Sequence, residues 1–323
     1  MRVNRTLLGW GIFLVVLGGV PLAIRLGGIS ASTLADAWRL WPLIIIGVGI
    51  SVLLRRTAWS LVGGVVVAAT VGVIAGSIVA SGGPTTGACS TDRLPSEYTK
   101  SSGPFTSPAT VVLSIDCGRL AVTTAAGADW SAQVGQIGGL TPEVKSEANQ
   151  LTIESKGRGN GLDSGEPGDD WAITLPTGVE TTLKATLNLG RTTLDLSNGT
   201  LDEVDASTNL GDLRLDLTGA TARALTFSTN LGSGSLTLPD SSLTADVTSD
   251  LGSLKICVPS GVGLRVTTKN DTLASISWGG AGLVKVDETH YQSTGWSTAV
   301  NRIEMTLSTN LGSVAFNPSA GCR

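Results

Sequence analysis

The chain has 323 residues, of which 41% are hydrophobic, and a formal net charge of −4 that is divided unevenly. Residues 1–80 carry six arginines and one aspartate, whereas residues 81–323 carry 16 basic and 25 acidic residues, a net charge of −9. Nucleic-acid binding requires a basic face, so the acidic C-terminal part argues against nucleic acid as a partner. The length allows two or more domains.

Three uncharged apolar runs, 7–24, 40–54 and 59–80, occupy the N-terminal part. As a helix the third run would extend about 33 Å, which matches a hydrocarbon core of ~30 Å. The second run is short, and Pro42 near its start is typical of a helix N-terminus. No Ala-x-Ala cleavage site follows the first run, which argues against a cleaved signal peptide. We therefore predict a transmembrane region at 1–80 with three spans and membrane lipid as a partner; the alternative is two spans, with 40–54 partly at the interface.

Small residues recur every four positions along the third run. Such a spacing leaves a groove in which a second helix can approach closely, either within the protein or from a membrane partner. The alternative explanation is that glycine and alanine are simply common in spans. The predicted helix-packing face consists of Gly64, Ala68, Gly72, Gly76 and Ala80.

The arginines indicate which side of the membrane the chain occupies. Arg2 and Arg5 precede the first run, and Arg55 and Arg56 separate the second run from the third. Positive residues favour the cytoplasmic side, so three spans would place everything after Ala80 outside the cell. We therefore expect a multi-pass protein of the bacterial cell membrane with an extracytoplasmic C-terminal part.

All four cysteines, Cys89, Cys117, Cys257 and Cys322, lie after the predicted spans. An even number in an exported domain favours two disulfides, and four cysteines allow three connectivities. They form no close C-x-x-C pair of the kind that binds zinc. A clasp between Cys89 and Cys322, at the two ends of the domain, is one hypothesis.

Residues 81–110 are rich in Ser, Thr, Gly and Pro, a composition typical of a flexible or extended linker. The remainder, 111–323, repeats the tripeptide Asn-Leu-Gly. The first three intervals are 21, 21 and 20 residues, and the last gap of 60 would be three more periods. Such a period predicts an all-β repeat domain, a β-solenoid whose units bury their apolar rows by stacking. The structural turns are expected at Asn188 and Gly190, Asn209 and Gly211, Asn230 and Gly232, Asp250 and Gly252, and Asn310 and Gly312.

Period-two alternation between the tripeptides predicts half-buried strands; Leu213, Leu215 and Leu217 are one example. Asp116-Cys117-Gly118 resembles an early, diverged copy. Glycine allows positive φ at a corner, and asparagine can bond to the asparagine of the next unit. A calcium ladder would need several carboxylates at each turn, whereas four of the five turns carry an amide. We therefore expect structural turns, with no metal and no cofactor.

No catalytic constellation is evident. His290 is the only histidine, no Gly-x-Ser-x-Gly elbow accompanies it, and it lies 40 residues after Asp250, where the period would place another turn. The acidic cluster Asp163, Glu166, Asp169 and Asp170 is best interpreted as a solvated loop, with cation binding as the alternative. The expected protein is not an enzyme.

Two stretches carry a family resemblance. Trp38–Gly49, following Gly9-Trp10-Gly11 and Leu17-Gly18-Gly19, resembles the small transmembrane region of LiaI- and LiaF-like bacterial proteins. Trp171–Val179 and the Asn-Leu-Gly repeats resemble the toastrack domains of LiaF-like and adhesin-like proteins. The resemblance implies a role in envelope-stress regulation or membrane-associated scaffolding, with no catalytic residues. It departs in one respect, because LiaF-like proteins are usually described with an even number of spans.

Two functions follow as hypotheses. The first is a membrane-anchored, non-enzymatic regulator or sensor of cell-envelope stress that acts through membrane partners, such as a sensor kinase or another envelope protein. The second is a structural or adhesive surface module without a signalling role. Stacked repeats offer long faces suited to binding polymers, and exposed edges could pair with another copy, so a homo-oligomer is compatible with either hypothesis.

Overall fold

The computed structural model describes Thr70, Pro95 and residues 97–106, 108–136, 141–155, 168–269 and 273–322. Apart from Thr70, which is helical, the predicted spans 7–24, 40–54 and 59–80 lie outside the described residues, as does the packing face from Gly64 to Ala80. Within the ranges just given, no helix combines the length and the apolar character needed to cross a bilayer.

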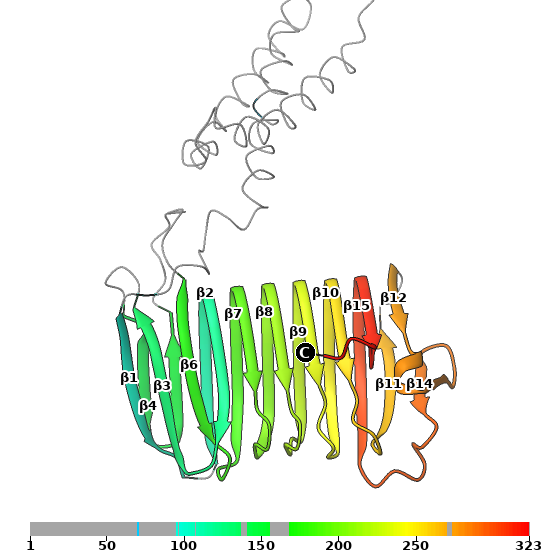
Figure 1. Cartoon of the computed structure of the whole chain (residues 1–323), viewed down its shortest axis with the longest axis horizontal. Coiled ribbons are helices and arrows are strands. Elements are labelled where there is room, and N and C mark those ends of the chain that lie inside the picture. The colour runs from blue at the N-terminus through cyan, green and yellow to red at the C-terminus, as the bar shows by residue number, and fades with distance from the viewer. Residues whose placement is uncertain are drawn as a thin grey trace, which may run out of the picture. The chain divides into compact units, whose positions relative to one another are not determined.

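The described residues after 95 form an all-β domain of one 15-stranded sheet (Figure 1). A 3-10 turn, η2 (Gly279–Ala281), lies between its twelfth and thirteenth strands. The strands are β1 (Glu97–Pro104), β2 (Ala109–Ala125), β3 (Asp129–Gln136), β4 (Glu143–Glu147), β5 (Gln150–Glu154), β6 (Asp169–Pro176), β7 (Thr181–Asp195), β8 (Leu201–Asp216), β9 (Ala224–Thr237), β10 (Leu243–Cys257), β11 (Gly263–Lys269), β12 (Leu273–Ser277), β13 (Leu283–Lys285), β14 (His290–Ser293) and β15 (Arg302–Phe316).

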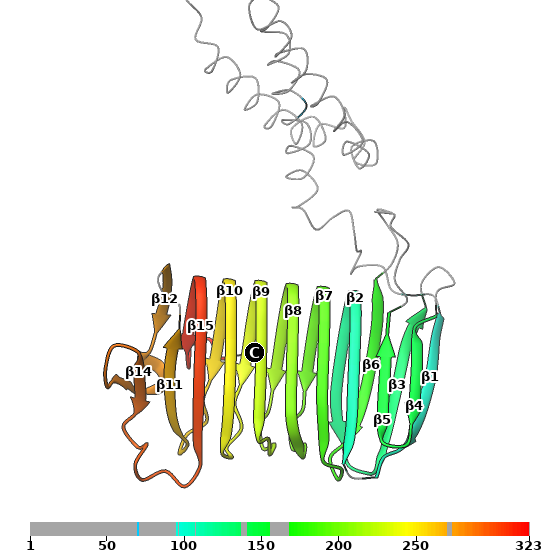
Figure 2. The same cartoon turned by 180° about the vertical axis from the view of Figure 1, so that it is seen from behind.

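Six long strands, β2, β7, β8, β9, β10 and β15, form the rungs of the stack and pair in parallel in that order. Each rung folds back at a corner, so its first half and its second half lie in two opposite layers, as both views show (Figures 1 and 2). The register is kept across the corner, where Gly190 pairs with Gly211 and Gly211 with Gly232. The predicted β-solenoid is therefore present.

The corner depends on a glycine in each rung. In β7 the buried side chains are Leu183, Ala185 and Leu187 before the corner, and Thr192 and Leu194 after it. Leu187 and Thr192 are five residues apart, an odd spacing that breaks the alternation of the strand. The bend therefore lets the side chains of both halves point into the same interior. Gly190 makes this step with φ of 137°, and a Cβ there would lie 1.9 Å from the carbonyl oxygen of Gly118. Only glycine fits such a backbone. The same conformation, with φ between 137° and 151°, occurs at Gly118, Gly190, Gly211, Gly232, Gly252 and Gly312.

The Asn-Leu-Gly tripeptides were predicted to separate strands, but they lie inside them. Backbone pairing continues through Leu210 and Gly211 to both neighbouring rungs, because glycine absorbs the bend without ending the strand. The turns that join successive rungs lie elsewhere, for example at Ser197–Gly199 between β7 and β8. Asp116-Cys117-Gly118 is a true copy of the corner, since Gly118 pairs with Gly190.

The last strand, β15, is inserted into the stack rather than added to its end. It pairs with β10 on one side and with β11 and β12 on the other. The expectation that the 60-residue gap contains three further periods is therefore wrong, because Gly252 and Gly312 are direct neighbours. Strands β11 and β12 together form the next rung, divided where the corner would lie.

The N-terminal end of the stack is also a divided rung. Strands β5 and β6 pair with the first and second halves of β2, and β4, β3 and β1 continue outward as antiparallel strands. Because β1 covers residues 97–104, the prediction of a flexible linker over 81–110 is wrong for that segment. Tyr98 on β1 donates a hydrogen bond of 2.8 Å to the Asp170 carboxylate on β6, and burial together with this bond raises the pKa of Tyr98.

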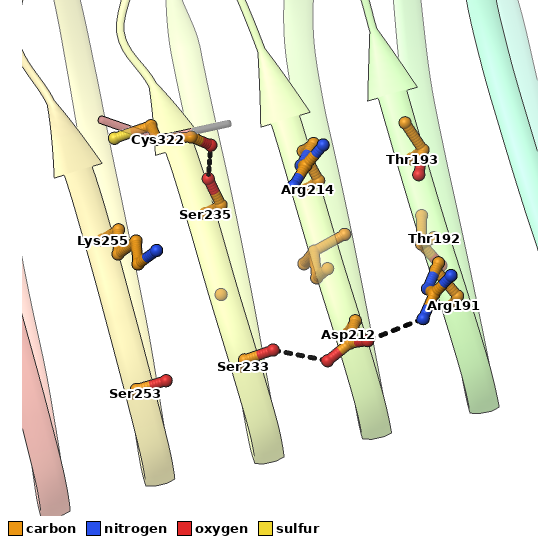
Figure 3. A pocket seen from close by; sticks show the side chains of 12 residues that line it. Arg191, Thr192, Thr193, Asp212, Arg214, Ser233, Ser235, Ser253, Lys255 and Cys322 are labelled. Carbon is orange, nitrogen blue, oxygen red and sulfur yellow. Dashed lines mark hydrogen bonds and ion pairs between the residues drawn. The ribbon is translucent and has the colours of Figure 1, made fainter. Parts of the chain in front are cut away.

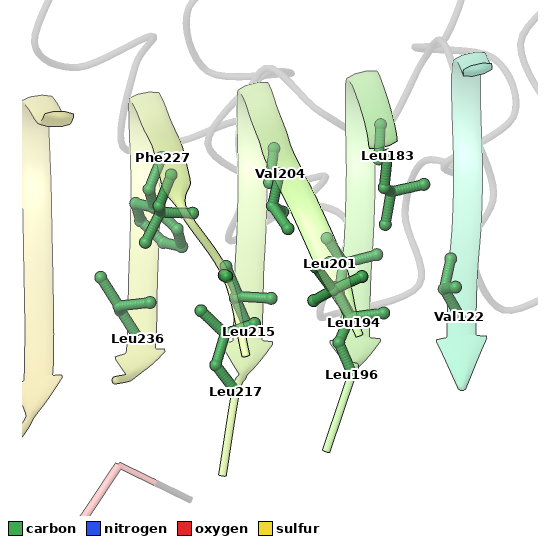
Figure 4. Close-up of a cluster of buried hydrophobic side chains, with 14 of the residues drawn as sticks. Val122, Leu183, Leu194, Leu196, Leu201, Val204, Leu215, Leu217, Phe227 and Leu236 are labelled. Atoms are coloured by element: carbon green, nitrogen blue, oxygen red, sulfur yellow. The ribbon is translucent and has the colours of Figure 1, made fainter. Parts of the chain in front are cut away.

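The core fills the space between the two layers. Figure 4 shows Leu183, Leu194, Leu215 and Leu236 pointing inward from successive rungs. Each is at most 1% exposed. On β9 the ring of Phe227 occupies the space over Gly234, where a Cβ would lie 3.0 Å from the ring. Every rung thus buries its apolar row against both neighbours and the opposite layer, which is why one period alone would have no core.

Candidate ligand-binding groove

A groove of about 670 Å³ crosses the outward face of the second halves of β7, β8, β9 and β10. On this face the register aligns Arg191, Asp212, Ser233 and Ser253 in one row across the rungs. A second row, two residues further along each strand, aligns Thr193, Arg214, Ser235 and Lys255. Figure 3 shows these side chains standing on neighbouring strands. Three cations and one carboxylate give the groove a net charge of +2 within an acidic domain.

The carboxylate in the groove is already engaged. Asp212 Oδ2 lies 3.5 Å from Nη2 of Arg191, and Asp212 Oδ1 accepts a hydrogen bond from the hydroxyl of Ser233 (Figure 3). Both contacts join adjacent rungs. The Arg191–Asp212 pair is largely exposed, so it contributes little to stability by itself.

The two remaining cations have no such partner. Arg214 and Lys255 make no ion pair or hydrogen bond with any residue that the structure describes, and they stand on either side of Ser235. Strands in a sheet are ~4.8 Å apart, so their Cα atoms are separated by roughly 10 Å. Lys255 is half-buried and Arg214 is exposed. Two unpaired cations in one groove can bind an anion.

The C-terminal tail lies beside this pair of cations. A disulfide joins Cys257, at the end of β10, to Cys322, and the carbonyl oxygen of Cys322 accepts a hydrogen bond from the Ser235 hydroxyl. The side chain of Asn317 bonds to the backbone of Val258 through both its oxygen (2.7 Å) and its nitrogen (3.3 Å). The tail is thereby fixed across the face towards β9 (Figure 1).

These contacts settle part of the cysteine hypothesis. Cys322 pairs with Cys257, so the hypothesis of a clasp between Cys89 and Cys322 is wrong; the tail turns back onto β10 instead of meeting the start of the domain. Cys117 is also disulfide-bonded, and the described part of the chain holds no free cysteine. Cys89 lies outside the described residues.

The predicted asparagines form a ladder along the corner, separate from the groove. Asn209 Nδ2 donates to Asn188 Oδ1 over 2.7 Å, and Asn230 Nδ2 donates to Asn209 Oδ1 over 2.8 Å. At its start Asn188 donates to Asp116. At the far end Asn310 donates to Asp250 over 2.6 Å. The amides therefore bond to one another from rung to rung.

The exposed leucines of the last three tripeptides are a feature that the sequence reasoning missed. Leu231, Leu251 and Leu311 are 47%, 49% and 48% exposed, and they pair in register along the corner. The period-two pattern stops at the corner, so these leucines belong to no buried row. The repeat itself was the signal that could have revealed them, since all three lie between a corner Asn or Asp and a corner glycine.

The candidate catalytic and metal-binding residues do not assemble. His290 begins β14, pairs with Thr267 and contacts Asp287 through Nδ1 at 2.7 Å, so its prediction as a corner residue is wrong. Hydrogen bonds from the Thr289 backbone and from the His290 ring lower the pKa of Asp287. Among the residues that the structure describes, no three His, Cys, Asp or Glu side chains are grouped closely enough to hold a metal ion.

The acidic cluster is divided by the structure. Asp169 is buried and accepts a hydrogen bond of 2.6 Å from Ser155, and Asp170 accepts the bond from Tyr98. Both belong to strand β6 rather than to a solvated loop. Asp163 and Glu166 lie outside the described residues.

One protein family matches part of the β-solenoid, and two solved structures have a low similarity to the chain. Residues 100–239 match the family described as the N-terminal domain of toast_rack, DUF2154. A solved candidate cell adhesion protein from Clostridium sporogenes ATCC 15579 has 16% identity and a TM-score of 0.47, over 68% of this chain and 99% of that chain. A solved candidate adhesin from Bacteroides fragilis NCTC 9343 has 11% identity and a TM-score of 0.29, over 68% and 97%. No curated protein matches the chain. Residues 100–239 of the β-solenoid are thus similar to the N-terminal domain of toast_rack.

Proposed function

We propose that the protein is a non-enzymatic surface module of the bacterial cell envelope, anchored in the membrane by its N-terminal part and presenting the β-solenoid outside as a binding surface. One observation carries this proposal. A groove crosses four rungs of a regular stack and contains the unpaired cations Arg214 and Lys255. Long faces of stacked repeats are suited to extended ligands.

The stack holds this surface in a fixed geometry. Each rung is paired by backbone hydrogen bonds to both neighbours over most of its length, and side-chain ladders add contacts along the corner. The groove residues stand on the four middle rungs, and one intact rung, β2 or β15, separates them from the divided rung at either end. A preformed surface loses little conformational freedom when it binds a ligand.

The side of the membrane can be tested at Val300, which is 92% exposed. In intact cells a membrane-impermeant maleimide should label a Val300→Cys variant without prior reduction. A Thr57→Cys variant, in the predicted cytoplasmic turn, should be labelled only after lysis. The native cysteines Cys257 and Cys322 are joined in a disulfide and should react only after reduction.

Two results would contradict the proposal. Labelling of Val300→Cys only after lysis would place the solenoid in the cytoplasm. Recovery of the full-length chain in the soluble fraction, without detergent, would contradict the proposed membrane anchor. Comparing both variants in the same cells controls for permeability of the membrane to the reagent.

The second candidate function is regulation or sensing of envelope stress through a membrane partner. The small-residue face from Gly64 to Ala80 in the sequence supports it, as does the resemblance of Trp38–Gly49 to LiaI- and LiaF-like proteins. Replacing Gly72 and Gly76 with leucine is expected to abolish a specific crosslink to that partner. An unchanged crosslink would exclude this route.

A further inference from the structure

We propose that the groove binds an extended anionic polymer that carries phosphate groups, held between Arg214 and Lys255. This inference names the ligand class of the binding surface proposed above and in that respect depends on it. It does not depend on whether the protein is anchored in a membrane or on which side of the membrane the solenoid lies, so the two proposals are tested by different measurements.

The first step concerns the two cations of the groove that have no partner among the described residues. Asp212 is satisfied by Arg191 and Ser233, so it competes little for the other two cations. Two further carboxylates stand on the same face, Asp195 and Asp216. Each accepts hydrogen bonds from its own turn through one oxygen, from Ser197 and Thr218 respectively. Arg214 and Lys255 therefore remain available to a ligand.

The second step is the arrangement of donors. Beside Ser235, whose hydroxyl is bonded to the Cys322 carbonyl oxygen, a ligand oxyanion in the groove would have a guanidinium on β8 to one side and an ammonium on β10 to the other. The hydroxyls of Thr193 and Ser253 line the same groove and make no hydrogen bond with a described residue. Arginine offers a planar fork and lysine a point charge, a pair of donors that suits phosphate. A phosphate also presents several acceptor oxygens to donors that stand on three different rungs.

The third step is the extent of the groove. From Arg191 on β7 to Lys255 on β10 it crosses three rung spacings and two residues, which is roughly 16 Å. The groove lies on a sheet face, with the C-terminal tail bordering it at Cys322. A ligand with repeated charges can therefore contact Arg191 as well as the central pair, which a single small anion cannot do.

The test uses the full-length protein in an uncharged detergent and a fluorescent inorganic polyphosphate of defined length. Arg214→Gln and Lys255→Gln should each weaken binding roughly tenfold, the size expected for one charge-assisted hydrogen bond. Each variant should also lower the dependence of log affinity on log salt by about one ion. Arg214→Lys keeps the charge but loses the fork, and it should lie between wild type and Arg214→Gln.

The matched control is Lys269→Gln. Lys269 is exposed, lies on the opposite face at the end of β11, and has no ion-pair partner in the described part of the chain. This substitution changes the net charge by the same amount and should leave the affinity unchanged. The unfolding midpoint should be the same for all variants, because none of the three side chains contributes a packing contact to the core.

Three outcomes would overturn the proposal. Wild-type affinity in both groove variants would exclude the groove as the site. An equal loss in Lys269→Gln would show attraction to net charge alone. Equal binding of a polycarboxylate of the same charge, such as polyglutamate, would reject phosphate as the recognised group. None of these outcomes would change the expected labelling of Val300→Cys, so a failure of this proposal can be distinguished from a failure of the proposed function.

Discussion

Single residues at the corner determine whether one rung can stack in register on the next. Gly211 illustrates this, since a Cβ there would lie 1.8 Å from the carbonyl oxygen of Gly190. Asn209 bonds to the asparagines before and after it, which uses its donor and its acceptor together. The corner therefore combines a backbone requirement with a side-chain ladder.

The ladder is interrupted at one residue. Asn230 donates to Asn209, but the next rung carries Asp250 at the corner, whose side chain lacks the N–H group of an amide. Within the described part of the chain, the Asn230 oxygen accepts no hydrogen bond. Asp250 does accept one, from Asn310.

Asp250→Asn is expected to complete the ladder. The new amide would donate to Asn230 and keep an oxygen for Asn310, so the free energy of unfolding should rise by about 0.5–1 kcal/mol. The measurement is equilibrium denaturation with urea. Asp246→Asn, on the same strand and facing solvent, makes the same charge change without touching the ladder. An equal gain in that variant would show that relief of negative charge, and not the ladder, is responsible.

At the scale of one strand, the corner separates leucines of two kinds. In β10, Leu251 stands at the corner and is 49% exposed, whereas Leu254 points into the core and is 1% exposed. The two leucines are three residues apart. The same contrast holds in β15 between Leu311 and Leu307, with 48% and 0% exposure.

Leu254→Ala should lower the free energy of unfolding by about 2–5 kcal/mol, because it leaves a cavity between the layers. Leu251→Ala should cost less than about 1 kcal/mol, because this side chain loses no buried contact. Both variants should be measured in the same urea denaturation series, so that their free energies of unfolding are compared under identical conditions. A large loss at Leu251 would mean that the corner leucines pack against something in the intact protein.

Strand order belongs to this scale as well. The repeat predicts strands and their period, and the pairs from β7 to β10 follow chain order. The position of β15 does not, because it enters between β10 and β11 and so pairs on both sides. A strand joins whichever edge offers a matching row of apolar side chains, and sequence distance does not limit that choice.

For the whole molecule, the disulfide between Cys257 and Cys322 closes a loop of 65 residues that contains β11 to β15. It therefore ties together the segment whose chain order and spatial order differ. The double variant Cys257→Ser, Cys322→Ser should lower the free energy of unfolding by about 4 kcal/mol, since an open loop restores entropy to the unfolded chain.

This loss can be measured by denaturation in the absence of reductant. In the presence of reductant, wild type and the double variant should become equally stable, which isolates the contribution of this bond from that of the disulfide at Cys117. Equal stability without reductant would show that the backbone pairing of β15 alone holds the segment.

The sequence by itself determined the all-β repeat domain, the corner residues and the inward rows, because these depend on local periodicity and on the backbone freedom of glycine. It also indicated an even set of oxidised cysteines. The spans at 7–24, 40–54 and 59–80 remain predictions. The insertion of β15, the pairing of Cys257 with Cys322 and the strand at 97–104 were decided only by tertiary structure, because each depends on which distant edges meet. The groove belongs to this second class. Arg214 and Lys255 are 41 residues apart in sequence, and only the register of three parallel strands brings them to the two sides of Ser235.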